Sequence, residues 1–373
     1  KKSFLSEKES VQWAEISCLV DSFAKQYVIK KTKDVKFVSP AESHFYVNRR
    51  ATIINNKGQF FRLTSSEQKK CSKLIKRMSL YSAGLYVEFR TDANEFWIEV
   101  HYLKYMQLTN MSVKGISGLD VYIFSPNVNK WDYVDTIEPN GLNTKKMLGH
   151  IKLDITGEKL IRIYLSSYAS IRSLYLGFLS ETMIHPHLHR KTKPIVFYGS
   201  SITQGCAADH VGDNYVNKVS RTLGFDEINY GFSESAFGEP EIAQMIADIE
   251  SSGIVIEYDH NATVETLKKT HYNFYRIIRE KRRDVPIVLI SRLSGGLSVS
   301  QEEAIIRFEI IKNTYNLAKK AGDNKIYLVN GNQLLENETK KLYFADDRHP
   351  NRKGMDIIYE AVVDAIGRIG DGN

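Results

Sequence analysis

Two short segments of the sequence carry side chains that together could perform acyl transfer. The first is the segment 199–205, which is rich in small residues, contains Ser201 and directly follows the apolar stretch 195–198. The second is Asp346-Asp347-Arg348-His349-Pro350, close to the C-terminus. An Asp three positions before a His can hydrogen-bond one imidazole nitrogen, which leaves the other nitrogen to accept a proton from a serine hydroxyl. Ser201, His349 and Asp346 are therefore predicted as nucleophile, general base and orienting acid.

Each segment has a simpler interpretation when it is considered alone. A serine in a small-residue turn often caps a helix, and Asp346 and His349 could be a capping residue and a surface side chain. The combination indicates chemistry, because it supplies a nucleophile, a base and a group that orients the base. The elements that carry the two segments must then bring them together.

From Pro194 onward the sequence alternates apolar strands with amphipathic helices. Strands are predicted at 195–198, 227–230, 253–257, 286–290 and 325–329, and helices at 215–223, 239–251, 264–281, 301–320 and 352–366. Uninterrupted apolar strands separated by helices are typical of a parallel sheet that is covered on both faces. Active sites gather at the carboxyl ends of the strands of such sheets, and the turn with Ser201 follows the first strand.

The segment from Phe37 to Gly177 has a different pattern, in which short stretches alternate apolar and polar residues. Such stretches occur at 84–90, 95–102, 119–124 and 159–165, separated by segments rich in Asn, Gly and Pro. A period of two indicates strands with one buried face, and several of them without a long helix indicate an antiparallel β-sandwich. We therefore predict two domains: a β-sandwich accessory domain over residues 1–185, with a leading segment that could be helical, and an α/β domain over residues 190–373.

The order of these motifs resembles that of the SGNH (GDSL-like) hydrolase family. Its four sequence blocks are matched in order by 199–203, by Asn229-Tyr230-Gly231-Phe232-Ser233, by Asn261, and by Asp346-x-x-His349-Pro350. The resemblance implies a three-layer α/β/α hydrolase domain. The segments 89–92, 118–122 and 164–168 resemble the jelly-roll-like β-sandwich that precedes this domain in one branch of the family.

The same resemblance implies an oxyanion hole made by the amide of Ser201, the amide of residue 234 and the side chain of Asn261. The family usually has glycine at the second of these positions, whereas this chain has Glu234. Glutamate tolerates a positive φ poorly, and a carboxylate close to an oxyanion would be unfavourable. Asn261 has an alternative role as a turn residue that caps the helix at Thr263.

Composition and charge limit the other functions. The 373 residues carry a net charge of +7, but the basic runs at 30–33 and 281–283 are short and have no interleaved aromatic residues. Nucleic-acid binding is therefore not expected. No apolar run approaches the roughly 20 residues that span a bilayer. The first residues lack the apolar stretch of a signal peptide, which is compatible with a cytoplasmic location or, if a leader has been removed, with secretion.

Cysteines and histidines give no complete metal site. The three cysteines lie far apart and make neither a metal-binding spacing nor a disulfide framework. His185, His187 and His189 would face one side of an extended segment at the domain junction, but no nearby carboxylate or Cys completes a ligand set. We expect no metal and no organic cofactor.

These observations predict a serine hydrolase that cleaves an ester bond through an acyl-enzyme. The resemblance to the branch with an N-terminal sandwich implies a glycan ester as substrate, with O-acetyl groups on a carbohydrate as the first candidate. Three alternatives stay open. They are a lipase, thioesterase or peptide-cleaving hydrolase of the same fold, a glycan-binding protein that has lost activity, and a scaffold whose sandwich binds partner proteins.

Overall fold

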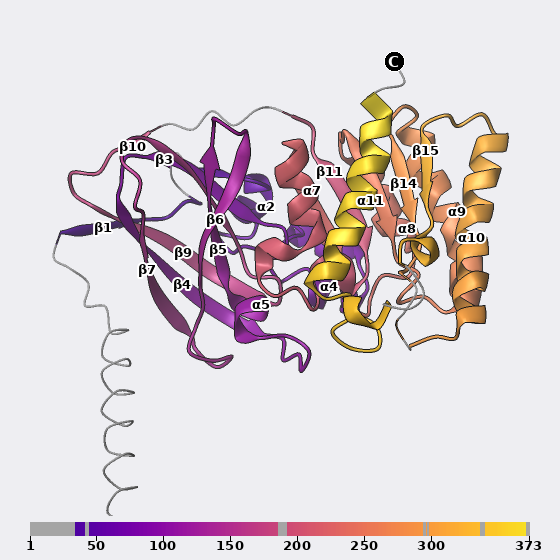
Figure 1. The fold of residues 1–373 in the computed structure, drawn as a ribbon, viewed down its shortest axis with the longest axis horizontal. Coiled ribbons are helices and arrows are strands. Elements are labelled where there is room, and N and C mark those ends of the chain that lie inside the picture. Colours follow the sequence, from indigo (N-terminus) through magenta and orange to yellow (C-terminus); the bar gives the residue numbers. More distant parts are fainter. Residues whose placement is uncertain are drawn as a thin grey trace, which may run out of the picture.

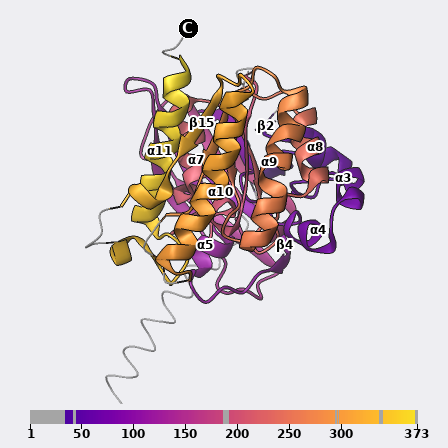
Figure 2. The same cartoon turned by 90° about the vertical axis from the view of Figure 1, so that its right-hand side faces the viewer.

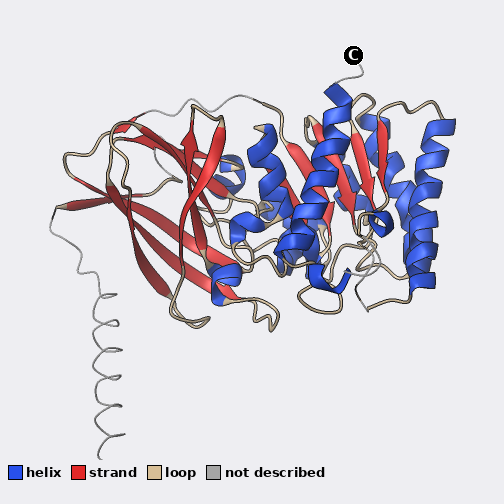
Figure 3. Ribbon diagram, viewed as in Figure 1, coloured by secondary structure: helices blue, strands red, loops and turns tan. Residues whose placement is uncertain are grey.

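The computed structural model describes residues 34–41, 45–185, 192–293, 296, 298–335 and 340–370. The leading segment that could be helical, and His187 and His189, lie outside the described residues. Antiparallel sheets occupy one end of the molecule and a parallel sheet flanked by helices occupies the other (Figures 1 and 3). In the part of the chain that the structure describes, no helix is both long and apolar enough to cross a membrane.

The N-terminal domain consists of two antiparallel sheets that pack face to face. One has the strand order β1-β9-β4-β7, and the other has the order β10-β3-β8-β5-β6, with β2 paired to β3. Apolar side chains at alternate positions of both sheets form one core, which includes Phe89, Phe96 and Phe178. The strands are β1 (Val35–Val38), β2 (Tyr46–Val47), β3 (Tyr86–Thr91), β4 (Glu95–Tyr105), β5 (Leu119–Ser125), β6 (Lys130–Ile137), β7 (Lys146–Lys152), β8 (Lys159–Tyr164), β9 (Ala169–Leu179) and β10 (Ile184–His185).

Within the described part of this domain, four short helices interrupt the strands, and they were not predicted from the sequence. They are α2 (Arg50–Asn55), α3 (Ser65–Lys70), α4 (Lys73–Met78) and α5 (Val113–Ser117). Their starts have local signals: Thr64 accepts a hydrogen bond from Glu67 N while the Glu67 side chain accepts one from Thr64 N, which is a capping box. With five or six residues each, these helices are too short for a helical period to stand out in the sequence.

The C-terminal domain is built on a five-stranded parallel sheet with the order β12-β11-β13-β14-β15. Its strands are β11 (Ile195–Gly199), β12 (Glu227–Gly231), β13 (Gly253–Glu257), β14 (Ile287–Ile290) and β15 (Ile326–Val329). Its helices are α6 (Ser201–Gln204), α7 (Tyr215–Leu223), α8 (Pro240–Asp248), α9 (Val264–Lys281), α10 (Gln301–Lys320) and α11 (Arg352–Gly370), with 3-10 turns η1 (Val211–Asp213), η2 (Gly331–Gln333) and η3 (Lys340–Tyr343).

Two separate cores hold the helices to the two faces of the parallel sheet. Helices α8, α9 and α10 share one core with the sheet, and α7 and α11 share the other. Figure 2 views the molecule from the end where α9 and α10 lie. The structure therefore has the predicted three-layer α/β/α arrangement after an antiparallel sandwich.

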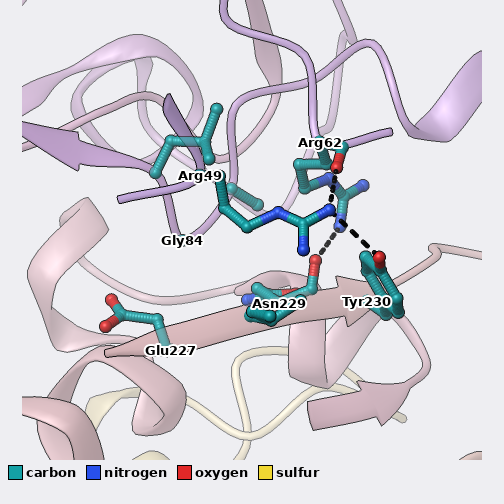
Figure 4. A pocket seen from close by; sticks show the side chains of 9 residues that line it. Arg49, Arg62, Gly84, Glu227, Asn229 and Tyr230 are labelled. Carbon is teal, nitrogen blue, oxygen red and sulfur yellow. Dashed lines mark hydrogen bonds between the residues drawn. The ribbon is translucent and has the colours of Figure 1, made fainter. Parts of the chain in front are cut away.

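A buried arginine of the sandwich domain donates hydrogen bonds to both domains. Arg62 is 2% exposed, and its guanidinium donates to the carbonyls of Met78 and Tyr81 on its own side and of Asn229 and Gly231 in β12. Figure 4 shows this narrow junction. Gly84 approaches β12 so closely that a Cβ there would lie 2.5 Å from Asn229 Cβ. The domain interface is thus closely packed beside the first strands of the parallel sheet.

Candidate active site

Ser201 is the first residue of α6, two residues after the end of β11, at the carboxyl end of the parallel sheet. The Ser200 side chain caps α6 by accepting a hydrogen bond from Ile202 N. The strand passes so close to β13 that a Cβ at Gly199 would lie 2.3 Å from Glu257 O. Gly205 ends α6 at φ 108°, a conformation that favours glycine. The small residues in this segment are therefore required by the tight turn that presents the serine.

A buried carboxylate under the turn fixes its shape. Glu257, at the end of β13, accepts hydrogen bonds from Ser200 Oγ and Thr203 Oγ1, each at 2.9 Å. Burial and the nearby Asp259 raise the pKa of Glu257 to about 8, and the two hydroxyls oppose that rise. The carboxyl group of Glu257 is thus a structural support of the turn that carries Ser201.

Glu257, Asp259 and His260 form a compact group whose ligand atoms lie within 4.8 Å of one another. Apart from the buried Asp259 Oδ1, these ligand atoms already have protein partners, however. Arg292 N donates to Asp259 Oδ2 at 3.1 Å, and the Arg292 guanidinium lies 3.3 Å from His260 Nδ1. A cation would have to displace these contacts and share the space with a guanidinium, so we assign no metal to this group.

The structure brings Ser201, His349 and Asp346 into one hydrogen-bonded chain. Ser201 Oγ lies 3.0 Å from His349 Nε2, and His349 Nδ1 lies 2.8 Å from Asp346 Oδ2. The two segments are 148 residues apart in the sequence. Asp346 and His349 lie in the loop before α11, and the bridge between Phe344 and Pro350 closes that loop. The geometry is that of a hydroxyl, an imidazole and a carboxylate arranged for proton transfer.

Asp346 remains ionised because its oxygens are surrounded by donors. Oδ1 accepts hydrogen bonds from the backbone amides of Arg348 at 2.8 Å and His349 at 2.7 Å. Partial burial raises the pKa of Asp346, but these amides and the imidazole outweigh it and lower the pKa to about 2. A charged Asp346 favours the tautomer in which His349 carries its proton on Nδ1, so that Nε2 can accept a proton from Ser201.

A residue of the sandwich domain, Asn110, also contacts this group and was not predicted from the sequence. Asn110 Nδ2 donates to Asp346 Oδ2 at 2.8 Å and lies 3.2 Å from His349 Nδ1. It also lies 3.4 Å from the sulfur of Cys206, a buried thiol whose pKa is raised to about 11 by burial. An asparagine in a polar loop has ordinary turn composition, so sequence alone offered no signal for this contact.

A second sandwich residue contacts the serine turn. The Tyr168 hydroxyl, which is buried, donates to the backbone carbonyl of Ser201 at 3.3 Å. Tyr168 belongs to the segment 164–168 that resembles the family's sandwich, although the sequence assigned it no role. Both domains therefore supply atoms that surround Ser201.

The two other residues expected in the oxyanion hole lie on neighbouring loops. Glu234 has φ 55°, the left-handed conformation that glycine adopts readily, and its side chain is exposed to solvent. Asn261 Nδ2 donates to Phe232 O at 3.1 Å, which ties the Asn261 loop to the Glu234 loop. Helix α9 is capped by Thr263 itself, which accepts from Thr266 N, so the alternative role of Asn261 as the helix cap is not observed.

Comparisons with known proteins agree with this architecture. The GDSL-like Lipase/Acylhydrolase family matches residues 192–367, and the family described as the N-terminus of Esterase_SGNH_hydro-type matches residues 35–184. No curated protein matches the sequence.

Solved structures with the same arrangement of domains include a protein described as a GDSL-like lipase from Bacteroides ovatus. It is 25% identical, has a TM-score of 0.79, and the match covers 90% of this chain and 98% of that one. The salicylyl-acyltransferase SsfX3 from a tetracycline biosynthetic pathway is 18% identical, with a TM-score of 0.70 and coverage of 91% and 99%. A family two carbohydrate esterase from Clostridium thermocellum, in complex with cellohexaose, is 13% identical, with a TM-score of 0.59 and coverage of 77% and 93%.

The two family matches adjoin each other and correspond to the two domains of the fold. The match to residues 192–367 covers the parallel sheet and the serine turn, and the match to residues 35–184 covers the antiparallel sandwich. The chain belongs to the SGNH (GDSL-like) hydrolase family, in the branch with an N-terminal β-sandwich domain, and is an esterase of the acylhydrolase class.

Proposed function

We propose that this esterase removes O-acyl groups, with acetyl the first candidate, from a carbohydrate through an acyl-enzyme on Ser201. The observation that carries the proposal is the continuous chain from Ser201 Oγ to His349 Nε2 at 3.0 Å and from His349 Nδ1 to Asp346 at 2.8 Å. An acylhydrolase needs such a nucleophile with its base and orienting acid, and these residues occupy the carboxyl edge of the sheet.

In this mechanism Ser201 Oγ attacks the carbonyl carbon of the ester while its proton passes to His349 Nε2. The tetrahedral intermediate collapses when the C–O bond to the alcohol breaks, and His349 returns the proton to that alcohol. Water then attacks the acyl-enzyme, gives its proton to His349 and releases the acid, after which Ser201 regains its proton. Asp346 holds the imidazole and stabilises its positive charge in both halves of the reaction.

For the developing oxyanion we propose three donors: the amide of Ser201, the amide of Glu234 and the side chain of Asn261. The left-handed backbone at Glu234 supports this assignment, because it is a conformation that glycine adopts readily, and the Glu234 side chain is exposed to solvent. One hydrogen of the Asn261 amide bonds Phe232 O, and the other remains for the substrate. Oriented donors of this kind each contribute about 3 kcal/mol to transition-state stabilisation.

The carbohydrate part of the proposal is supported by likeness of fold. The carbohydrate esterase from Clostridium thermocellum shares both domains of the arrangement at 13% identity, and its structure contains cellohexaose. A fold alone does not determine a substrate. The deciding experiment is therefore a screen of acetylated oligosaccharides that measures released acetate, with a short-chain lipid ester and an acyl-thioester as competing substrates.

The role of Ser201 is tested by labelling with a fluorophosphonate probe and by the variant Ser201→Ala. We expect the wild-type protein to be labelled at Ser201, and the variant to lose labelling and to lower kcat on p-nitrophenyl acetate by about 10⁴-fold or more. Ser66→Ala is the control, because Ser66 lies at an exposed position in α3, in the sandwich domain, and its loss should leave labelling in place. Equal hydrolysis by wild type and Ser201→Ala would remove Ser201 from the mechanism.

A further inference from the structure

A cavity of about 530 Å³ opens between the two domains, outside the group formed by Ser201, His349 and Asp346. The sandwich domain lines it with Lys114 of α5, Tyr122 of β5 and four consecutive residues of β6, 130–133. The hydrolase domain lines it with side chains of α7, of α11 and of the segment 210–213. Its volume falls in the range of roughly 300–1,000 Å³ that is usual for small-molecule sites.

Three cationic side chains at the inner wall of this cavity gather around one buried carboxylate. The buried carboxylate of Asp213 is shared by three cations: His210 Nε2 at 3.0 Å, Lys218 Nζ at 3.3 Å and Arg352 Nε at 3.7 Å. Burial lowers the pKa of His210, but its hydrogen bonds to Asp120 and Asp213 outweigh this and raise the pKa to about 9. His210 is therefore charged at neutral pH and is paired with both Asp120 and Asp213. Lys218 also contacts Asp356, at 2.6 Å.

Two further cations of the lining have no carboxylate partner among the described residues. Arg221 lies 4.2 Å from the centre of the Tyr122 ring and donates to Gly212 O at 2.8 Å. Lys114 lies 5.7 Å from the centre of the Tyr133 ring. At the rim, Asp132 is 3.8 Å from Lys130.

Across the described lining, six cationic side chains face three carboxylates, Asp132, Asp213 and Asp356. Asp120, which bonds His210 from behind the lining, reduces this excess without removing it. An anionic ligand would therefore be attracted into the cavity.

Two chain segments contribute residues both to the lining of the cavity and to the active site. Arg352 follows His349 by three residues, and Lys114 follows Asn110 by four. At 3.8 Å per residue, these cations lie within about 11 Å and about 15 Å, Cα to Cα, of residues that contact Asp346. A ligand of a few sugar rings could therefore occupy the cavity while one of its ester groups reaches Ser201.

We propose, on the basis of the proposed function, that this cavity binds the carboxylate of an acidic sugar, and that the substrate is an acylated oligosaccharide containing uronic acid. Lys114, Arg221 and Arg352 supply the charge that recognises the carboxylate. The ring of Tyr133, which is 41% exposed, supplies an apolar face against which the C–H face of a sugar can pack. The aromatic and cationic residues thus favour an acidic saccharide over a neutral one.

Binding is tested by calorimetry on Ser201→Ala, which removes turnover, with trigalacturonic acid and cellotriose as the acidic and neutral probes. We expect the acidic trisaccharide to bind about tenfold more tightly. The double change Lys114→Gln and Arg352→Gln in the same background should abolish that preference. The matched control is Lys269→Gln with Lys320→Gln, which removes the same charge from exposed positions on other helices and should keep the preference.

Kinetics of the active enzyme distinguish an effect on binding in the cavity from an effect on catalysis at Ser201. In Lys114→Gln/Arg352→Gln, we expect KM for an acetylated oligogalacturonate to rise about tenfold, whereas kcat/KM for p-nitrophenyl acetate, which is too small to reach the cavity, stays unchanged. Added salt should raise the wild-type KM for the acidic substrate only.

Equal binding of the acidic and neutral probes, or an unchanged preference in the Lys114→Gln/Arg352→Gln protein, would overturn the inference. If the wild type hydrolyses no acetyl ester, the proposed function fails, and the calorimetry still decides whether the cavity binds acidic sugars.

Discussion

Asp346 is the point at which residues of both domains meet. One of its oxygens accepts two backbone amides of its own loop, and the other accepts His349 Nδ1 and the side chain of Asn110. The imidazole is therefore held by a carboxylate whose own position is fixed from two directions. A group that orients a base is effective only when it is itself rigid, so Asn110 is a candidate positioning residue.

The variant Asn110→Ala tests this role. Loss of one hydrogen bond to a carboxylate should lower kcat on p-nitrophenyl acetate by about tenfold, with KM little changed. Asn110→Asp should reduce activity further and move the acidic limb of the pH–rate profile upward, since an added negative charge beside the imidazole favours its protonated form, which cannot act as the base. Thr109→Ala, at the exposed neighbouring position, is the control. A profile for Asn110→Asp that coincides with wild type would show that Asn110 is only structural.

Glu234 occupies a left-handed conformation at φ 55° that side chains other than glycine adopt at a cost. We expect Glu234→Gly to increase the free energy of unfolding by about 1 kcal/mol and to retain esterase activity, because the backbone amide stays in place. Urea unfolding followed by circular dichroism measures the free energy of unfolding, and hydrolysis of an acetyl ester measures the esterase activity.

Glu309→Gly is the matched control for this change, because position 309 lies inside helix α10. There the same substitution should lower stability by about 1 kcal/mol. A loss of stability in Glu234→Gly would contradict the expected relief of strain.

At the scale of elements, β5 and the segment that contains η1 are joined by a cluster of charges. Asp120 in β5 accepts hydrogen bonds from His210 and from Gly212 N, and His210 Nε2 lies 3.0 Å from Asp213. The pKa of His210 is about 9, compared with 6.5 for a free histidine. Because the folded protein holds this proton more tightly, the contribution of His210 to stability is complete below pH 6.5 and is lost as the pH rises through 9.

This linkage predicts that the wild type loses about 2 kcal/mol of unfolding free energy between pH 6.5 and pH 9.5 relative to His210→Gln. Urea unfolding at pH 6, 8 and 10 checks the prediction, and the difference between the two proteins should be largest at pH 6. Parallel pH dependence in the two proteins would show that His210 does not hold its proton in this way.

The sequence predicted regular elements well where their pattern was long. Helices at 264–281 and 301–320 agree with α9 and α10 at both ends, since Thr263 and Ser300 cap amphipathic segments. The parallel strands were recognisable because both faces are buried and the residues are continuously apolar. Helices α2 to α5 were missed because five or six residues show no clear period.

The prediction of the site has a similar limit. Ser201, Asp346 and His349 could be selected because their types and spacing suggest one reaction. Asn110 and Tyr168 could not, because their contacts depend on how two domains pack, which no local pattern specifies. The structure also shows a positive φ at Glu234, a conformation that glutamate was expected to tolerate poorly.

At the scale of the molecule, Arg62 connects the domains through carbonyls on both sides of the interface. Its removal would leave these buried acceptors without a donor, so Arg62→Ala should lower the free energy of unfolding by about 4 kcal/mol. Arg77→Ala, at an exposed position in α4, is the control and should change it by less than about 0.5 kcal/mol.

We further expect wild type to unfold in a single calorimetric transition, since so closely packed an interface couples the domains. Two transitions in wild type, or equal stabilities of Arg62→Ala and Arg77→Ala, would contradict this role of the interface.

The contact between Asn110 and Asp346 also constrains how enzymes of this architecture can be recombined. The loop between β4 and α5 and the loop before α11 form a matched pair although they are 236 residues apart. A chimera that takes its sandwich from one relative and its hydrolase domain from another would combine loops that had not diverged together. Such a chimera could fold well and still turn over slowly, until residues 106–112 and 344–350 were exchanged as a single unit.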